Sequence, residues 1–367
     1  MIRISGTLSL YIGRHFLGAF LLLFGVLLAL ILTLDTIELL RRAASKPDIT
    51  LPMIVELSLL KLPNMGQQMF PFAIFFSGML VFWRLTRSHE LVVTRAAGVS
   101  VWQFLLPVLL ISFCLGIFKV AALSPLSSST LARFDRLEAS LFEGKKNLLA
   151  ISDSGLWLRQ SSPAGQAVVH AAKVFQHGSD VELRDVTVFV YEGTDKFVRR
   201  IDAKLARLQD GFWHLLEAWV QAPEKQPQFE TEFWLETDLT IARIQDSFAP
   251  PETMSFWALP AFIKTLEKAG FSAVRHRLYF NTLLAAPVLM CAMILIAATF
   301  TLRHHRRGGT TFIIVGGILT GFILYFFSDL VFALGMSDSI PVTLAAWTPS
   351  VVAMLLGVAM LFHLEDG

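Results

Sequence analysis

The residues best suited to specific chemistry lie in a short charged segment, Arg84–Gly98, between two long apolar runs. Drawn as a helix, this segment places Arg87, Glu90 and Thr94 on one face. The other side of that helix carries Leu85, His89, Val92, Val93 and Ala96, with Ser88 and Arg95 on the flank. We predict a docking helix that a soluble protein partner binds. An ordinary loop between two membrane spans is the alternative.

Both ends of this segment carry helix-boundary signals. Ser88 is suited to capping the start, which places Glu90 in the first turn, where a carboxylate interacts favourably with the helix dipole. Gly98 is suited to ending the helix. The segment is too short and too charged to cross a membrane itself.

A second set of candidates consists of cations at the ends of apolar runs. Arg41 and Arg42 follow the first run, Lys119 lies near the end of the third, and Arg133 and Arg136 come after it. The guanidinium fork is suited to phosphate, so these cations predict contact with an anionic head group. For Lys119 the alternative is extension of its ammonium to the membrane surface. For the arginines the alternatives are solvation or pairing with the nearby acids Asp35, Glu38, Asp135 and Glu138.

The sequence contains no catalytic constellation. It has no G-x-x-x-x-G-K-[ST] loop to hold ATP phosphates, no H-E-x-x-H or paired-cysteine metal site, and no G-x-S-x-G nucleophile. We interpret His304-His305, in an arginine-rich loop, as solvated polar residues rather than metal ligands. We therefore expect no catalytic residue, metal or cofactor in this chain, and any energy from ATP must come from a partner.

These residues belong to a strongly apolar chain of 367 residues, 54% hydrophobic and 16% charged, with a net charge of +2. This composition is typical of an integral membrane protein with a separate water-exposed part, and no basic run supports a nucleic-acid partner. A membrane span needs about 20 mostly apolar residues. Six stretches meet this requirement: Phe16–Thr36, Met65–Trp83, Val101–Leu123, Tyr279–Leu302, Phe312–Leu334 and Leu344–Phe362. We expect an amphipathic piece, Leu51–Leu62, to end at Pro63, and Ser124-Pro125 to end the third span.

Between the third and fourth spans, the hydrophobic pattern changes to short alternating stretches separated by turn-rich pieces. Alternation at this spacing predicts an all-β sandwich or jelly roll. The expected strands are Leu148–Ser152, Gly155–Gln160, Ala167–Gln176, Val181–Tyr191, Phe197–Leu208, Phe212–Gln221 and Phe229–Ile244. A short helix, Phe256–Ala269, follows them.

The charges of the short loops predict the orientation in the membrane. The loops on the side of the N-terminus are richer in arginine, so the positive-inside rule places both termini and the Arg84–Gly98 segment in the cytoplasm. The β domain then lies on the other side. Arg41 and Arg42 are exceptions to this distribution of arginines, because they fall on the outer side of the membrane.

The ordered set of short motifs resembles the lipopolysaccharide-export permease family, LptF/LptG, over essentially the whole chain. The matching motifs are Tyr11-Ile-Gly-Arg14, Ser88-His-Glu-Leu-Val-Val93, Ala97-Gly98, Pro287, Arg307-Gly-Gly309 and Leu344-Ala-Ala-Trp-Thr-Pro349. The resemblance implies a membrane α-helical fold of six transmembrane helices with an inserted periplasmic β-jellyroll-like domain. The implied domains are residues 1–123 with a coupling helix at 84–98, residues 124–275, and residues 276–367.

The resemblance also implies a non-catalytic permease subunit in the bacterial inner membrane. Such a subunit pairs with an LptF-like permease, and an LptB-like ATPase dimer, which binds ATP and Mg, drives the extraction of lipopolysaccharide. LptC-like and LptA-like bridge proteins then receive the lipid on its way to the outer membrane. The implied ATPase-coupling residues are Glu90 with Arg87, His89, Leu91, Thr94 and Arg95. The implied lipid-binding residues are Arg41 and Arg42, with Arg133, Arg136 and Lys119 as further candidates.

One position departs from the family pattern, because Asp35 stands where the family has a basic residue. Two other functions remain open. The chain could be a membrane-anchored structural or sensor module that binds periplasmic partners, or an ATP-driven extractor of another lipid or of a lipoprotein.

Overall fold

The protein consists of two compact units in a computed structural model. The structure describes residues 6–44, 46, 49–96, 98–143, 149–152, 155–162, 165–177, 180–192, 196–209, 211–223, 225–237, 249–268, 271–302, 310–337 and 339–365. The membrane unit contains residues 1–137, 252–257 and 277–367, and the β unit contains residues 138–251 and 258–276. Residues 124–137 thus group with the membrane helices, whereas the sequence had placed the domain boundary at 123.

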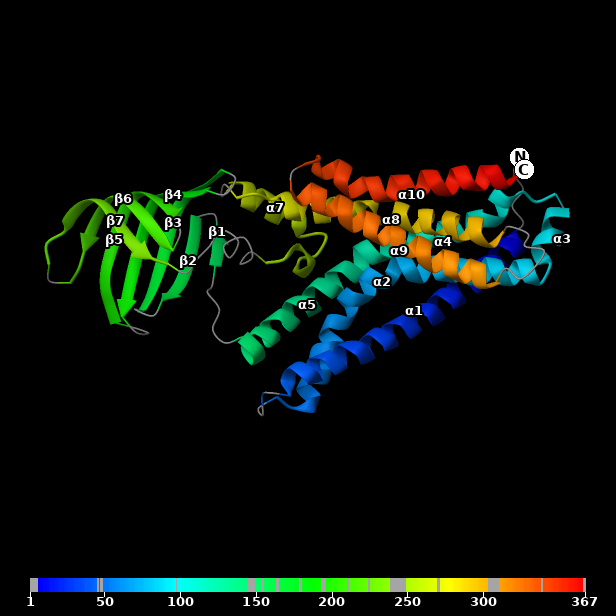
Figure 1. The fold of residues 1–367 in the computed structure, drawn as a ribbon, viewed down its shortest axis with the longest axis horizontal. Helices are drawn as coiled ribbons and strands as arrows, with labels where there is room; N and C mark the ends of the chain where they lie inside the picture. The colour runs from blue at the N-terminus through cyan, green and yellow to red at the C-terminus, as the bar shows by residue number, and fades with distance from the viewer. Residues whose placement is uncertain are drawn as a thin grey trace. The chain divides into compact units, whose positions relative to one another are not determined.

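The membrane unit provides six helices that are long and apolar enough to cross a membrane, within the described residues. This confirms the six predicted spans. The helices are α1 (Gly6–Ala43), α2 (Leu51–Arg87), the continuous run of α4 (Val101–Phe118), η1 (Lys119–Leu123) and α5 (Ser124–Glu138), α8 (Val274–Thr301), α9 (Thr310–Met336) and α10 (Val342–Glu365) (Figure 1).

Two helices continue past prolines that the sequence suggested would end them. α2 runs through Pro63, so the separate amphipathic piece and the second span are one helix. The third span runs past Pro125 by way of the π-helical turn η1. Pro125 has no N–H, which leaves the carbonyl of Ala121, four residues earlier, without its helical donor. The indole Nε1 of Trp257 donates to this carbonyl at 3.4 Å, so a side chain replaces the missing backbone hydrogen bond.

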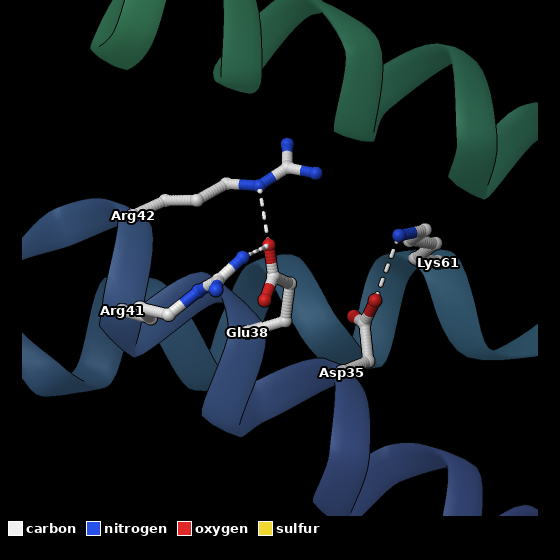
Figure 2. Close-up of polar contacts among 5 residues, drawn as sticks. All are labelled: Asp35, Glu38, Arg41, Arg42 and Lys61. Atoms are coloured by element: carbon white, nitrogen blue, oxygen red, sulfur yellow. Dashed lines mark hydrogen bonds and ion pairs between the residues drawn. The ribbon is translucent and has the colours of Figure 1, made fainter.

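Helix α1 packs against α2 and is fastened to it by polar side chains. Lys61 Nζ of α2 lies 2.7 Å from Asp35 Oδ1 of α1, and the Asp35 side chain is only 6% exposed (Figure 2). Next to this pair, Thr36 Oγ1 donates to Ser58 Oγ at 3.1 Å. Lys61 Nζ also lies 5.4 Å from the ring centre of Phe134 on α5. The outer surface of α1 is apolar and uncovered, so these contacts with α2 hold its second half in place.

Within the described residues, the β unit is an antiparallel sheet of seven strands, and each overlaps one of the predicted strands. Residue 148 of the first predicted strand and residues 238–244 of the last lie outside the described residues. In order they are β1 (Leu149–Ser152), β2 (Gly155–Ser162), β3 (Gly165–His177), β4 (Asp180–Glu192), β5 (Lys196–Gln209), β6 (Phe212–Gln221) and β7 (Gln228–Glu236). Each strand pairs with its neighbour in the sequence, which makes a meander. The all-β insert is confirmed, and among the described residues it is one sheet rather than a sandwich of two. A short helix, α7 (Leu259–Lys268), belongs to the same unit.

The sheet is strongly curved, so that a residue of β2 contacts residues of β6 and β7. In a flat sheet, β2 and β6 would lie about 19 Å apart, four strand spacings. Instead Trp213 Nε1 of β6 donates to Gln160 Oε1 of β2 at 3.3 Å, and Thr237 Oγ1, just after β7, donates to the same oxygen at 2.7 Å. Gln160 Nε2 in turn donates to the carbonyl of Glu236 at 3.2 Å. Gln160 is 2% exposed, so a buried polar side chain links these strands across the mostly apolar inner face of the sheet.

We expect Gln160→Leu to destabilise the β unit. The change removes the buried oxygen that accepts hydrogen bonds from Trp213 and Thr237, which should lower the free energy of unfolding by about 1–3 kcal/mol. Hydrogen exchange of the β2 and β7 amides in the full-length protein measures this effect. Gln228→Leu, at an exposed position of β7, is the control and should leave exchange unchanged. Equal protection in both variants would show that the Gln160 hydrogen bonds contribute nothing.

We also expect Asp35→Ala to loosen α1, because it leaves a half-buried Lys61 without its carboxylate. Removing this charge-assisted hydrogen bond should cost about 1.5–3 kcal/mol. Lys61→Met keeps the packing on Phe134 and removes the stranded charge, so the double variant should be more stable than Asp35→Ala alone. Thermal unfolding of the purified protein in detergent tests this. A double variant that is as unstable as the sum of the two single changes would argue against a coupled pair.

Candidate functional site

The charged segment predicted as one helix is two helices joined by a turn. α2 ends at Arg87, Ser88 and His89 form the turn, and α3 spans Glu90–Ala96. His89 has a φ of 61°, in the left-handed region that residues other than glycine rarely adopt. The prediction of one continuous helix from Arg84 onward was therefore wrong, because the left-handed conformation of His89 interrupts the helix.

The break changes which side chains of α3 are covered. Leu91 is 3% exposed and anchors α3 to the membrane unit. Val92 and Val93 are 42% and 68% exposed, although a continuous helix would place them on the same face as the buried Leu85. α3 therefore presents two valines outward beside its charged residues.

The carboxylate of Glu90 accepts a hydrogen bond from the turn before it. Ser88 Oγ donates to Glu90 Oε1 at 2.9 Å, and the hydroxyl of Tyr11 on α1 lies beside the same carboxylate. Ser88 thus acts on the Glu90 side chain, and among the described residues its hydroxyl donates rather than accepts, as an N-cap would require. The hydrogen bond from Ser88 restricts the orientation of the carboxylate, and α3 lies close to the start of α1.

The other candidates of this segment surround Glu90. Thr94 Oγ1 donates to the carbonyl of Glu90 at 2.7 Å, one helical turn away. The guanidinium of Arg87 lies over the ring of Trp83, 5.2 Å from its centre. Both Arg95 and His89 are exposed.

Gly98 ends the segment as the sequence predicted. Its φ is 84°, and its N–H donates to the carbonyl of Arg95 at 2.9 Å. Ser100 and Gln103 then form a reciprocal capping box that starts α4. Because helix boundaries lie on both sides, the segment has a defined conformation.

We name the exposed surface made by Arg87, His89, Val92, Val93 and Arg95, with Glu90 at its edge, the docking surface.

The second candidate region is a group of charged residues near the end of α1. A single oxygen, Glu38 Oε1, accepts hydrogen bonds from Arg41 Nη2 at 2.9 Å and from Arg42 Nε at 3.2 Å (Figure 2). The spacing of three and four residues places all three side chains on one turn of α1. Together with Asp35 and Lys61, one turn earlier and on α2, these residues form what we call the α1 charge cluster.

The remaining predicted cations are arranged differently. Arg133 Nη2 of α5 forms an ion pair with Glu56 Oε1 of α2 at 2.7 Å. Arg136 Nε donates to the carbonyl of Ala132, one turn earlier. Lys119 begins the π-helical turn η1, and the structure records no ion pair for it within the described part of the chain. Of the five cations, only Arg41 and Arg42 are thus brought together on one acid.

Two residues that lie in these regions were not predicted from the sequence. Lys61 joins the charge cluster through Asp35, and Tyr11 joins the docking segment through Glu90. Both contacts connect different helices, so no local spacing signals them. The shared role of Glu38 did have a local signal, because an acid three and four residues before two arginines favours such pairs.

Neither region carries a catalytic or metal-binding arrangement. Among the described residues, no group of three or more histidine, cysteine or acidic side chains could hold a metal ion. The His304-His305 pair lies outside the described residues. The docking surface combines exposed apolar side chains with charge, and the charge cluster presents exposed guanidinium groups.

Comparison with known proteins identifies the family of the chain. Residues 10–363 match the family model described as lipopolysaccharide export system permease LptF/LptG. The chain is 23% identical to the lipopolysaccharide export system permease protein LptG of Haemophilus influenzae, over 95% of this chain and 96% of that protein. It is also 23% identical to the protein of the same name in Escherichia coli K12, over 98% of both chains. The chain therefore belongs to the LptF/LptG family of lipopolysaccharide export permeases.

Proposed function

We propose that this chain is the non-catalytic permease subunit through which a separate ATPase drives the extraction of lipopolysaccharide from the bacterial inner membrane. The docking surface is the observation that carries this proposal. It is a short helix anchored by the buried Leu91, with exposed valines beside arginine and glutamate, in a sequence that lacks a phosphate-binding loop of its own. An LptB-like dimer that binds ATP and Mg is the partner this surface fits.

The contacts of Glu90 suggest how motion of the ATPase reaches the lipid. Glu90 lies beside Tyr11 near the start of α1, and Arg41 and Arg42 lie near the end of the same helix. α1 has 38 residues, which makes it about 57 Å long. A displacement of α3 would therefore pull directly on the helix that carries the charge cluster.

The charge cluster is the proposed contact for the phosphate groups of lipopolysaccharide. Arginine binds phosphate through two parallel hydrogen bonds, and Arg41 and Arg42 are both exposed beside apolar membrane-facing residues of α1. Arg133, Arg136 and Lys119 are less direct candidates, since Arg133 and Arg136 bind separate partners and Lys119 is half-buried.

The family and the charge of the loops support the remaining assembly. We propose an LptF-like permease as the second membrane subunit, and LptC-like and LptA-like proteins as the acceptors of the lipid. The arginine-rich loops support an orientation with both termini and α3 in the cytoplasm and the β unit in the periplasm. The uncovered apolar residues of α1 and α9, such as Leu22 and Phe322, support contact with lipid or with the second permease.

The ATPase assignment predicts that Glu90→Ala weakens binding of the ATPase. Loss of the oriented carboxylate should reduce its affinity by about tenfold, or 1.4 kcal/mol, while membrane insertion and thermal stability stay close to wild type. Co-purification on the tagged permease, followed by titration of the recovered ATPase, measures this. Glu230→Ala, on β7, removes one carboxylate elsewhere and is the control. If Glu90→Ala retains wild-type affinity and transport, α3 is not the coupling element.

The lipid assignment predicts that Arg41→Glu combined with Arg42→Glu lowers the crosslinking of lipopolysaccharide to α1. Charge reversal repels phosphate, and the yield from a photoreactive residue at the exposed position Ile37 should fall by about tenfold. The matched control reverses another adjacent pair, Arg199 and Arg200 on β5, and should leave the yield at position 37 unchanged. Unchanged crosslinking in the first variant would exclude Arg41 and Arg42 from the lipid site.

A further inference from the structure

Helix α9 carries an acid, Asp329, that neither the docking surface nor the α1 charge cluster uses. It lies about five residues, or about 7.5 Å along the helix axis, before Leu334, where the predicted apolar run ends. Its side chain is exposed, and within the described residues the structure records no hydrogen bond or ion pair for it. A carboxylate at this depth of a membrane span is unfavourable unless a cation or a polar cavity shelters it.

Asp329 lies on the side of α9 that the described part of the chain leaves uncovered. The opposite side packs against α2, where Gly317 lies close to Met79. Phe326 and Phe322, one and two turns before Asp329, are 63% and 66% exposed. Because residues one and two turns apart share a face of a helix, the acid belongs to the same apolar surface as these two rings.

The exposed residues on this side of α9 have the spacing of a helix-packing seam. Steps of four and three residues alternate along it, which keeps one stripe facing a neighbouring helix. A single polar residue in such a stripe lowers stability, but it fixes the register and the choice of partner through the group that it pairs with. We name this stripe the α9 seam, and it consists of Val315, Leu319, Phe322, Phe326, Asp329 and Ala333.

The depth of Asp329 determines which cation can reach it. The ammonium group of a zwitterionic lipid lies at the head-group level, beyond the end of the apolar run, and lipid phosphate repels a carboxylate. Lysine and arginine instead carry their charge on a long apolar stem, which can lie along a helix inside the hydrocarbon. A basic side chain on a neighbouring membrane span is therefore the group whose length and charge fit this acid.

We propose that Asp329 selects the second permease, because its carboxylate pairs with a lysine or arginine on a membrane span of that subunit, packed on the α9 seam. The inference rests on the proposed pairing with an LptF-like permease, and it names the residue and the charge that choose this partner. A second copy of this chain, docked α9 against α9, brings two carboxylates to the same level, where they repel each other. The acid thus favours an unlike partner over self-association.

Three substitutions at one position test the role of the charge. Asp329→Asn keeps the size of the side chain without its charge, Asp329→Glu keeps the charge, and Asp329→Leu makes the seam wholly apolar. The full-length chain and the second permease are labelled with a donor and an acceptor fluorophore, and energy transfer is measured in liposomes as added lipid dilutes them. We expect Asp329→Asn and Asp329→Leu to lower the affinity about fivefold, and Asp329→Glu to stay within about twofold of wild type.

Asp329→Leu distinguishes a partner from lipid, because leucine suits a lipid-facing position better than aspartate does. Equal or tighter pairing in this variant overturns the inference, and so does an Asp329→Glu variant that is as weak as Asp329→Asn. Ser328→Ala is the matched control at the same level of α9. The Ser328 hydroxyl donates to the carbonyl of Leu324 on its own helix at 2.8 Å, so its removal should leave the affinity unchanged.

Photocrosslinking identifies the occupant of the seam without changing the acid. A photoreactive residue in place of Phe326 should attach to the second permease in native membranes. Attachment to lipid alone, or to a second copy of this chain, overturns the inference. Native mass spectrometry adds a lipid arm, because bound phosphatidylethanolamine that disappears in Asp329→Asn, with pairing unchanged, assigns the carboxylate to a lipid ammonium group and also overturns it.

Charge reversal identifies the paired residue and separates this inference from the proposed function. Asp329→Lys should lower the affinity by more than about tenfold, and one lysine-to-aspartate or arginine-to-aspartate change in the spans of the second permease should restore it. Failure of every such change contradicts a direct ion pair. If the wild-type chain pairs with no LptF-like permease, the proposed function is itself wrong. If wild type pairs and all variants at position 329 pair equally, only the role of Asp329 is wrong.

Discussion

The position of helix α1 is the constraint on which both binding regions depend. Much of its surface is apolar and uncovered by the rest of the chain, so packing alone leaves it weakly fixed. Two polar contacts compensate for this. Tyr11 lies beside Glu90 near its start, and Asp35 pairs with Lys61 in its second half. A helix held at two points is suited to transmit force, because hydrogen bonds between its ends resist stretching.

The α1 charge cluster places cations next to acids. Arg41 and Arg42 share Glu38, and Lys61 pairs with Asp35. The buried pair stabilises the contact between α1 and α2, whereas the Glu38 group lies exposed on a single turn of α1. The aspartate at position 35, unexpected among basic family residues, thus serves the helix contact.

Much of this architecture was predictable because its signals are local. Six runs of about 20 apolar residues identify the spans, and alternation with a period of two identifies all seven strands. Pro63 and Pro125 misled the prediction, because a proline inside a long membrane helix costs one hydrogen bond that neighbouring groups can replace. At Pro125 the replacement comes from Trp257, more than a hundred residues away, and no local pattern reveals it.

The sequence alone thus determined the class of the protein, its membrane spans, its β insert and the identity of the charged candidates. These properties follow from composition, periodicity and motifs, which are written in neighbouring residues. Only the tertiary structure decided that His89 divides the docking segment, that Tyr11 lies beside Glu90, and that Gln160 of β2 contacts residues of β6 and β7. It also showed that two arginines share one acid. Such facts depend on which side chains meet across helices and strands, and the free energy of a buried polar contact is set by that meeting rather than by spacing along the chain.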